Sequence, residues 1–271
     1  PVEFLQDREW HIRRPLPERA ALARAVAAIR AAKKPFIVAG GGVLYSGAED
    51  QLRGLVEATG IPVGTSQAGG GVLDWDHPQY LGGVGATGTL AANRIVAEAD
   101  VVIGIGTRYS DFTTASRTAF QNPDVVFVNI NVASFDAYKH GSQLPVIADA
   151  REALDELTIE LEGYGITPEY SERIATEKRQ WDASVDAAFA PTGAALPSQT
   201  EIIGAVQAMP SCLTLPAEIE LVATRVLSRS PFGAGHSSAW SETSGAPSDG
   251  SFAPLEPALP PPPPQPAPPA P

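Results

Sequence analysis

A short apolar run that ends in three glycines most constrains what this chain can fold into. Residues 36–39 are all apolar, Gly40, Gly41 and Gly42 follow at once, and an amphipathic segment covers about 48–59. A buried strand that stops at a glycine-rich turn and leads into a helix is typical of the first crossover of a parallel α/β sheet. Such glycines indicate either a phosphate or nucleotide site at a helix start or a tight crossover turn with close helix–sheet packing.

The chain from residue 17 to about 165 continues to alternate strand-like and helix-like segments. The run 101–106 is apolar throughout, as a strand covered on both faces should be. Further strands are expected over 61–65, 125–130 and 145–148, and helices over about 17–32, 87–98 and 150–161. This alternation predicts the α/β class, with an open, mostly parallel sheet and helices on both faces.

Ligands bind such sheets at the carboxyl ends of the strands. Here those ends carry the three glycines and the segments 66–71, 106–111 and 129–131. Arg108 could bind a phosphate or carboxylate, or it could pair with Asp111 and only fix its loop. Asn129 could contact a ribose or hold its own loop. The candidate cofactor-binding residues are therefore Gly40, Gly41, Gly42, Thr107, Arg108 and Asn129.

A second glycine-rich segment, 83–88, matches the pattern G-x-G-x-x-G ahead of a helix. The preceding residues 77–81 do not predict a strand, and no acidic residue ends a following strand at the expected place. The dinucleotide fingerprint therefore lacks its context. A packed glycine-rich turn, or a helix N-terminus near some other anion, is the favoured interpretation.

The composition excludes several classes of function. A formal net charge of −12 disfavours nucleic acid and anionic membrane surfaces as partners. No apolar run approaches the roughly 18 residues that span a bilayer. The single cysteine, Cys212, excludes an intrachain disulfide framework and a cysteine-rich zinc site, and it fits a cytoplasmic protein. His77 and His140 stand outside any metal-ligand pattern, so no catalytic or metal-binding residue is predicted.

Composition also divides the chain. We expect an N-terminal linker over 1–16, a central domain over 17–165 and a linker helix over 166–195. Residues 196–208 are interpreted as the start of a third domain, where Ser198 and Glu201 form a capping-box pattern. Residues 209–271 hold fifteen of the 26 prolines and predict a disordered tail, or the product of a shifted reading frame. Because the chain begins at Pro1 without Met, we expect a processed product or an excerpt.

Several segments resemble the central domain of thiamine-diphosphate-dependent enzymes of the acetolactate-synthase-like family. The similarity covers about residues 1–207. Its segments are 4–15 (FLQDREWHIRRP), 39–43 (AGGGV), 75–78 (WDHP), 106–108 (GTR), 111–114 (DFTT), 135–141 (FDAYKHG) and 196–200 (LPSQT). The first and sixth of these resemble a branch that opens the ring of a trihydroxycyclohexane-1,2-dione in myo-inositol catabolism. The resemblance implies a Rossmann-like domain.

Members of that family have three α/β domains. The first supplies the glutamate that activates thiamine diphosphate, and the third binds its diphosphate and Mg²⁺. The resemblance thus implies that this chain is a structural central domain, inactive alone, whose partners are other domains or subunits of a homo-oligomeric enzyme. In relatives that hold FAD in this domain, the loops matching 40–42, 106–111 and 129–131 lie near the nucleotide, so a vestigial nucleotide edge is implied here. The alternatives are a free-standing module that binds FAD or an adenine nucleotide such as ADP, and an interaction module that uses the proline tail.

Overall fold

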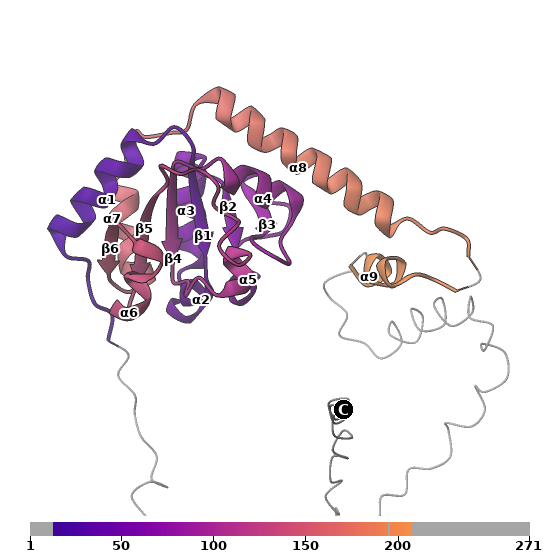
Figure 1. Cartoon of the computed structure of the whole chain (residues 1–271), viewed down its shortest axis with the longest axis horizontal. Helices are drawn as coiled ribbons and strands as arrows, with labels where there is room; N and C mark the ends of the chain where they lie inside the picture. Colours follow the sequence, from indigo (N-terminus) through magenta and orange to yellow (C-terminus); the bar gives the residue numbers. More distant parts are fainter. Residues whose placement is uncertain (1–12, 195, 208–271) are drawn as a thin grey trace, which may run out of the picture.

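The computed structural model describes residues 13–194 and 196–207. Six parallel strands form one open sheet (Figure 1). Along the chain they are β1 (Pro35–Ala39), β2 (Val63–Thr65), β3 (Tyr80–Gly83), β4 (Val101–Ile105), β5 (Val126–Asn131) and β6 (Leu144–Ile147). Helices connect and cover them, which confirms the predicted α/β class with an open parallel sheet.

The strand order places the two central strands far apart in the sequence. The order is β3-β2-β1-β4-β5-β6, so the chain builds one half of the sheet outward from β1 and then crosses back to start the other half at β4. β1 and β4 pair in register from Pro35 opposite Val101 to Ala39 opposite Ile105. At this kind of reversal the loops that leave neighbouring strands diverge, and a crevice opens at the carboxyl ends.

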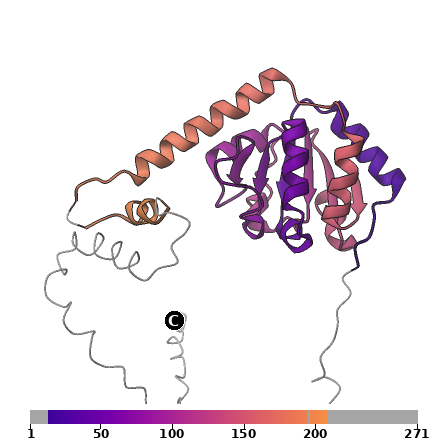
Figure 2. The ribbon, with the colours of Figure 1, turned by 180° about the vertical axis from the view of Figure 1, so that it is seen from behind.

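One face of the sheet is covered by α1 (Arg19–Ala31), α3 (Glu49–Thr59) and α7 (Ala150–Glu160). Figure 2, turned by 180° from Figure 1, shows this face of the molecule. In α1, Leu22, Val26 and Ile29 recur at helical spacing and are buried, as their periodicity predicts. Ile37 and Ala39 of β1 face this layer, because alternate strand residues point to opposite faces of a sheet.

The opposite face is covered by α4 (Leu90–Ala97) and by the first half of α8 (Pro168–Phe189). Phe36 and Val38 of β1 point to this layer, where they pack with residues of α4 and with Tyr170 and Ile174 of α8. The Tyr170 hydroxyl donates a hydrogen bond to the Pro35 carbonyl at 3.2 Å. The long helix is thereby attached to the start of the central strand, and its later turns extend past the sheet (Figure 1).

A buried carboxylate also holds α8 in place. Glu177 is 4% exposed, accepts a hydrogen bond from Arg94 of α4 at 3.1 Å and pairs with Arg173 one turn earlier in α8. Arg173 also contacts Glu98 at 3.2 Å. A buried charge needs such partners, because its desolvation is otherwise unfavourable.

The last described helix, α9 (Gln199–Gln207), begins with the capping box that the sequence predicts. The Glu201 carboxylate accepts from the Ser198 backbone N–H at 2.6 Å, while the Ser198 hydroxyl accepts from the Glu201 N–H at 3.2 Å. Hydrogen bonds from the backbone of Ser198 and Thr192 lower the pKa of Glu201 to about 2. The reciprocal cap is therefore formed with an ionised glutamate.

Two expectations differ from the structure. Residues 77–81 were expected not to form a strand, yet Tyr80–Gly83 is the edge strand β3. Gly41 and Gly42 are not only turn residues, because they open a short helix, α2 (Gly41–Ser46). Asn129 lies inside β5, within the strand that the sequence predicts over 125–130.

Some sequence predictions fall outside the described residues. Residues 1–12 of the expected N-terminal linker, the proline-rich segment 209–271 and Cys212 are among them. Of the linker, Arg14 is described: its guanidinium donates to the Ser46 carbonyl at 2.8 Å and to Asp149 at 3.0 Å. Within the described part of the chain, no helix combines the length and apolar character needed to cross a membrane.

We predict that Glu177→Gln lowers the free energy of unfolding by about 1–2 kcal/mol, because it leaves two arginines without their buried carboxylate. Urea denaturation followed by circular dichroism measures this loss. The matched control is Glu172→Gln, which removes an exposed pair with Arg179 and should cost less than about 0.5 kcal/mol. Equal losses in the two variants would contradict the role given to Glu177.

Candidate functional site

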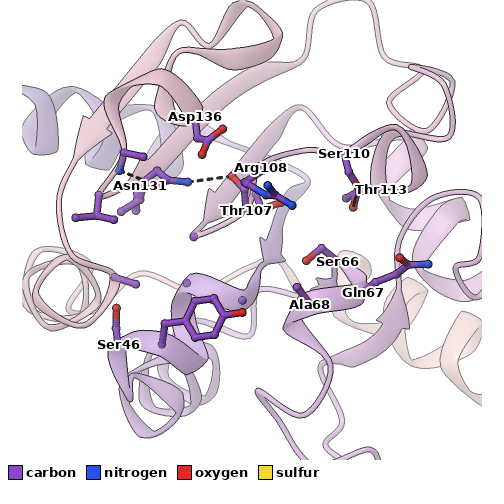
Figure 3. A pocket seen from close by; sticks show the side chains of 18 of the residues that line it. Ser46, Ser66, Gln67, Ala68, Thr107, Arg108, Ser110, Thr113, Asn131 and Asp136 are labelled. Carbon is purple, nitrogen blue, oxygen red and sulfur yellow. Dashed lines mark hydrogen bonds between the residues drawn. The ribbon is translucent and has the colours of Figure 1, made fainter. Parts of the chain in front are cut away.

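A cavity of about 600 Å³ lies at the carboxyl ends of β1 and β4, where the strand order reverses (Figure 3). All four segments that the sequence placed at this edge contribute residues to its lining. We call it the edge cavity. The polar residues that line it are Ser46, Ser66, Gln67, Thr107, Arg108, Ser110, Thr113, Asn131 and Asp136.

The glycines after β1 meet the end of β4 backbone to backbone. The Gly40 N–H donates to the Ile105 carbonyl at 2.8 Å, and the Gly42 N–H donates to the Gly106 carbonyl at 3.0 Å. A Cβ atom on Gly40 would lie 2.3 Å from the Gly106 oxygen, and one on Gly42 would lie 2.6 Å from the Gly106 Cα. Gly106 itself has φ +60°, which disfavours any side chain there. We call this contact the glycine crossing.

The glycine crossing bears on the two interpretations of the triple glycine. The backbone amides of Gly40 and Gly42 already donate to carbonyls at the end of β4, so they do not face a ligand. Gly41 is buried, lines the edge cavity and has the Ala68 side chain 3.2 Å from where its Cβ would be. The geometry therefore supports the tight crossover turn over a phosphate cradle at this sequence.

The loop after β4 holds two candidate residues with different roles. Thr107 is buried, and its carbonyl accepts a hydrogen bond from the Asn131 side-chain amide at 3.1 Å (Figure 3). Arg108 is exposed and lines the edge cavity. Among the described residues no carboxylate pairs with it, and Asp111 instead accepts from the Ser116 hydroxyl at 3.1 Å. Arg108 therefore does not fix its loop by pairing with Asp111, which was one of the two alternatives for this residue.

Asn129 does not line the edge cavity. It is 2% exposed, its amide donates to the Lys139 carbonyl at 3.3 Å, and its Oδ1 has no partner among the described residues. Asn131, two residues later on β5, does reach the cavity. The Asn131 side chain joins the loop after β5 to the loop after β4. Its Oδ1 accepts a hydrogen bond from the Ala133 N–H at 3.0 Å, and its amide donates one to the Thr107 carbonyl. The alternation of strand residues cannot separate the two positions, since both point to the same face.

The second glycine motif lies at the outer strand of the sheet, between β3 and α4. This is the strand–loop–helix context that was expected to be missing. Its polar groups are nevertheless engaged: the Gly85 N–H donates to Asn93 at 2.8 Å, and the Ala86 N–H donates to the Phe112 carbonyl at 2.8 Å. A Cβ on Gly85 would overlap the Phe112 oxygen, at 1.9 Å. The motif is a packed turn against α5 (Asp111–Thr114).

The isolated histidines are held by the backbone. His77 is 8% exposed, and its Nδ1 accepts from the Gln79 N–H at 3.3 Å, so a neutral ring carries its proton on Nε2. That nitrogen lies 3.8 Å from Glu57. His140 Nε2 lies 3.0 Å from the Tyr109 carbonyl, which can only accept, so this nitrogen donates.

Exposed large apolar side chains lie along the same edge, a feature that the sequence motifs do not reveal. Tyr45 of α2 is 84% exposed, and Phe135 of α6 (Ser134–Ala137) is 78% exposed. Phe112, Val132 and Tyr138 are also more than half exposed. We call these five residues the apolar rim. These side chains leave apolar surface exposed on the elements at this edge.

We predict that Gly42→Ala destabilises the domain by about 1–3 kcal/mol, because the new methyl group would overlap the backbone of Gly106. Gly54 of α3 is the matched control, since a Cβ there meets nothing within 4 Å. Gly54→Ala should raise stability by about 0.5–1 kcal/mol. Thermal and urea unfolding measure both changes. If Gly42→Ala were as harmless as the control, the glycine crossing would not be a packing constraint.

The sequence of this chain is similar to those of known proteins. The family model described as "Thiamine pyrophosphate enzyme, central domain" matches residues 22–157, which is the region of the sheet. Two proteins of one Bacillus cereus strain, 3D-(3,5/4)-trihydroxycyclohexane-1,2-dione hydrolases 2 and 1, are 49% and 48% identical over 185 residues. The corresponding hydrolase of Bacillus thuringiensis (strain Al Hakam) is 47% identical over the same length.

These matches cover 68% of this chain, but the chain spans only 29% of the length of each of these curated relatives. The family match covers the strands, the reversal point and the edge cavity. It confirms the resemblance that the sequence segments indicate. The chain therefore belongs to the thiamine pyrophosphate enzyme family, as a representative of its central domain.

Proposed function

We propose that this chain supplies the central domain of a thiamine-diphosphate-dependent hydrolase that opens the ring of a 3D-(3,5/4)-trihydroxycyclohexane-1,2-dione. The observation that supports this most is the 49% identity over 185 residues to a hydrolase with that name. The family match lies on the sheet, and the sheet carries the edge cavity.

The cofactor chemistry is proposed to lie outside the described residues. Thiamine diphosphate needs ligands for Mg²⁺, for which carboxylate and amide oxygens are suited. In residues 13–194 and 196–207, no group of three histidine, cysteine, aspartate or glutamate side chains could hold a metal ion. Of the described residues that line the edge cavity, Asp136 is the only acid, and it pairs with Lys139. These residues do not fit the diphosphate–metal group, so no reaction step is assigned to them.

The role proposed for the domain is to present a surface to the other domains or subunits of such an enzyme. The apolar rim supports this role, because it leaves five large side chains exposed at one edge. Helix α9 supports it too: its Ile202, Ile203 and Val206 are between 39% and 57% exposed. We propose that α9 starts a further domain and that this domain covers those side chains, with the boundaries expected from the sequence.

A chimera tests the proposal. Residues 13–207 replace the matching segment of the Bacillus cereus relative, and hydrolysis of the cyclic dione is measured. We expect kcat/KM within about tenfold of the parent enzyme, a change of about 1.4 kcal/mol or less in transition-state stabilisation. A control chimera carries the central domain of an acetolactate-synthase-like enzyme and should be inactive. A chimera of this chain that folds and binds thiamine diphosphate but does not hydrolyse the dione would contradict the assignment.

Calorimetry on the chain alone is the second arm of this test. The 271-residue chain should give no binding heat with thiamine diphosphate and Mg²⁺ and no turnover of the dione. Micromolar binding of that cofactor would contradict the proposal that the chain is inactive by itself.

A nucleotide-binding module is the alternative, and the edge cavity at the strand reversal is the observation that favours it. Arg108 is the side chain there that could bind a phosphate. In the same calorimeter, saturable binding of ADP or FAD that Arg108→Gln abolishes would support this alternative. The engaged amides of the glycine crossing favour the scaffold role instead.

A further inference from the structure

A second cavity, of about 440 Å³, is lined mainly by basic residues. Its lining residues are Arg108, Tyr109, Ser110, Arg117, Lys139 and His140. We call it the basic cavity. Of the described residues that line it, none carries a carboxylate, although the chain as a whole has an excess of acidic residues and a formal charge of −12. Such a local reversal of charge favours an anion.

The two guanidinium groups at this cavity have no acidic partner among the described residues. Lys139 does, because it pairs with Asp136 and lies 4.9 Å from the Phe135 ring centroid. The Arg117 backbone N–H donates to the Thr114 hydroxyl at 3.3 Å, which anchors the backbone of Arg117. Both guanidinium groups remain available to bind an oxyanion with two parallel hydrogen bonds.

The backbone of the cavity wall is strained. Tyr109, Arg117 and His140 line the cavity and have φ angles of +47°, +69° and +57°. Residues 115 and 116, which have φ angles of +47° and +53°, directly precede Arg117. These five are all the non-glycine residues with positive φ in the described part of the chain. Left-handed conformations in side-chain-bearing residues persist where surrounding contacts enforce them, and they cluster at ligand sites.

Packing enforces this wall. Tyr109 is 3% exposed and makes edge-to-face contacts with Phe120 and Phe127, at centroid distances of 6.0 and 5.9 Å. The His140 hydrogen bond to the Tyr109 carbonyl, at 3.0 Å, joins the two strained loops. The position of His140 is thereby fixed before any ligand arrives, which lowers the entropic cost of binding.

An apolar cavity of about 380 Å³ adjoins the basic one. Arg117 and His140 line both. Phe120, Val125 and Phe127 supply its apolar wall. A ligand whose charged group contacts the arginines can therefore place a ring or a short apolar body against these side chains.

We propose that the basic cavity binds the oxyanionic group, phosphate or carboxylate, of a small organic anion whose apolar body lies in the adjoining apolar cavity. This site adjoins the edge cavity and shares Arg108 and Ser110 with it, but Arg117 and His140 line the basic cavity and not the edge cavity. It does not depend on the proposed role in a hydrolase, since Arg117 and His140 belong to neither the glycine crossing nor the apolar rim.

Calorimetric titration of the full 271-residue chain with inorganic phosphate and with phenyl phosphate tests the site. Both should bind saturably, and phenyl phosphate should bind several-fold tighter because its ring is buried. Arg117→Asn should weaken phenyl phosphate binding by about tenfold, the equivalent of one charge-assisted hydrogen bond. Asparagine suits this position because it tolerates positive φ.

The matched control is Arg24→Gln, which removes one exposed arginine from α1. It should change the affinity by less than about twofold, because α1 contributes nothing to the lining of the cavity. Lys139→Gln is a second test variant, used if Arg117→Asn does not fold, and it should also weaken binding. Absence of saturable binding to the unmodified chain would overturn the proposal. So would binding that both test variants leave unchanged, because the anion would then occupy another site.

Discussion

The close contact between two turns of backbone, at the glycine crossing, is the constraint on which the rest of the structure depends. The turn after β1 and the turn after β4 approach so closely that neither can carry a side chain at Gly40, Gly42 or Gly106. Their hydrogen bonds join the carboxyl ends of the two central strands. Because β1 and β4 start the two halves of the sheet, this contact sets where the halves diverge and where the edge cavity opens.

The crossing also limits what the edge cavity can do. In nucleotide-binding sheets the amides of such a glycine turn face the phosphates. Here the amides of Gly40 and Gly42 donate to the end of β4 instead, and Asn131 uses both ends of its side chain on Thr107 and Ala133. The polar groups at the edge therefore mainly stabilise their own loops. Arg108 is an exception, since it is exposed and lines both the edge cavity and the basic cavity.

Much of the fold could be predicted from the sequence, because its central elements are strongly periodic or wholly apolar. The run that became β4 and the apolar stripe of α1 are examples. β3 was missed because half of its four residues are glycines and it lies at the edge of the sheet, where burial leaves little hydrophobic signal. α2 was missed because glycine is a poor helix former. The close approach of the Gly106 backbone explains why position 42 in this helix is a glycine.

The sites were harder to predict than the fold. The convergence of loops at one edge follows from strand order, but whether Asn129 or Asn131 reaches the cavity depends on neighbouring loops that no local pattern reveals. The basic cavity could not be predicted from the sequence at all. Arg117 and His140 lie on separate loops of the sequence, and they meet only because Tyr109 and its aromatic neighbours place the two loops together.

Hydrogen exchange of individual amides, measured by NMR, tests the central claim about the glycine crossing most directly. If the crossing holds the two halves of the sheet together, the amides of Gly40 and Gly42 should exchange only through global unfolding, with the same free energy as the amide of Ile103 in β4. If those glycine amides instead exchanged by local opening, at a free energy several kcal/mol below that of Ile103, the crossing would be a peripheral turn and the account would be contradicted.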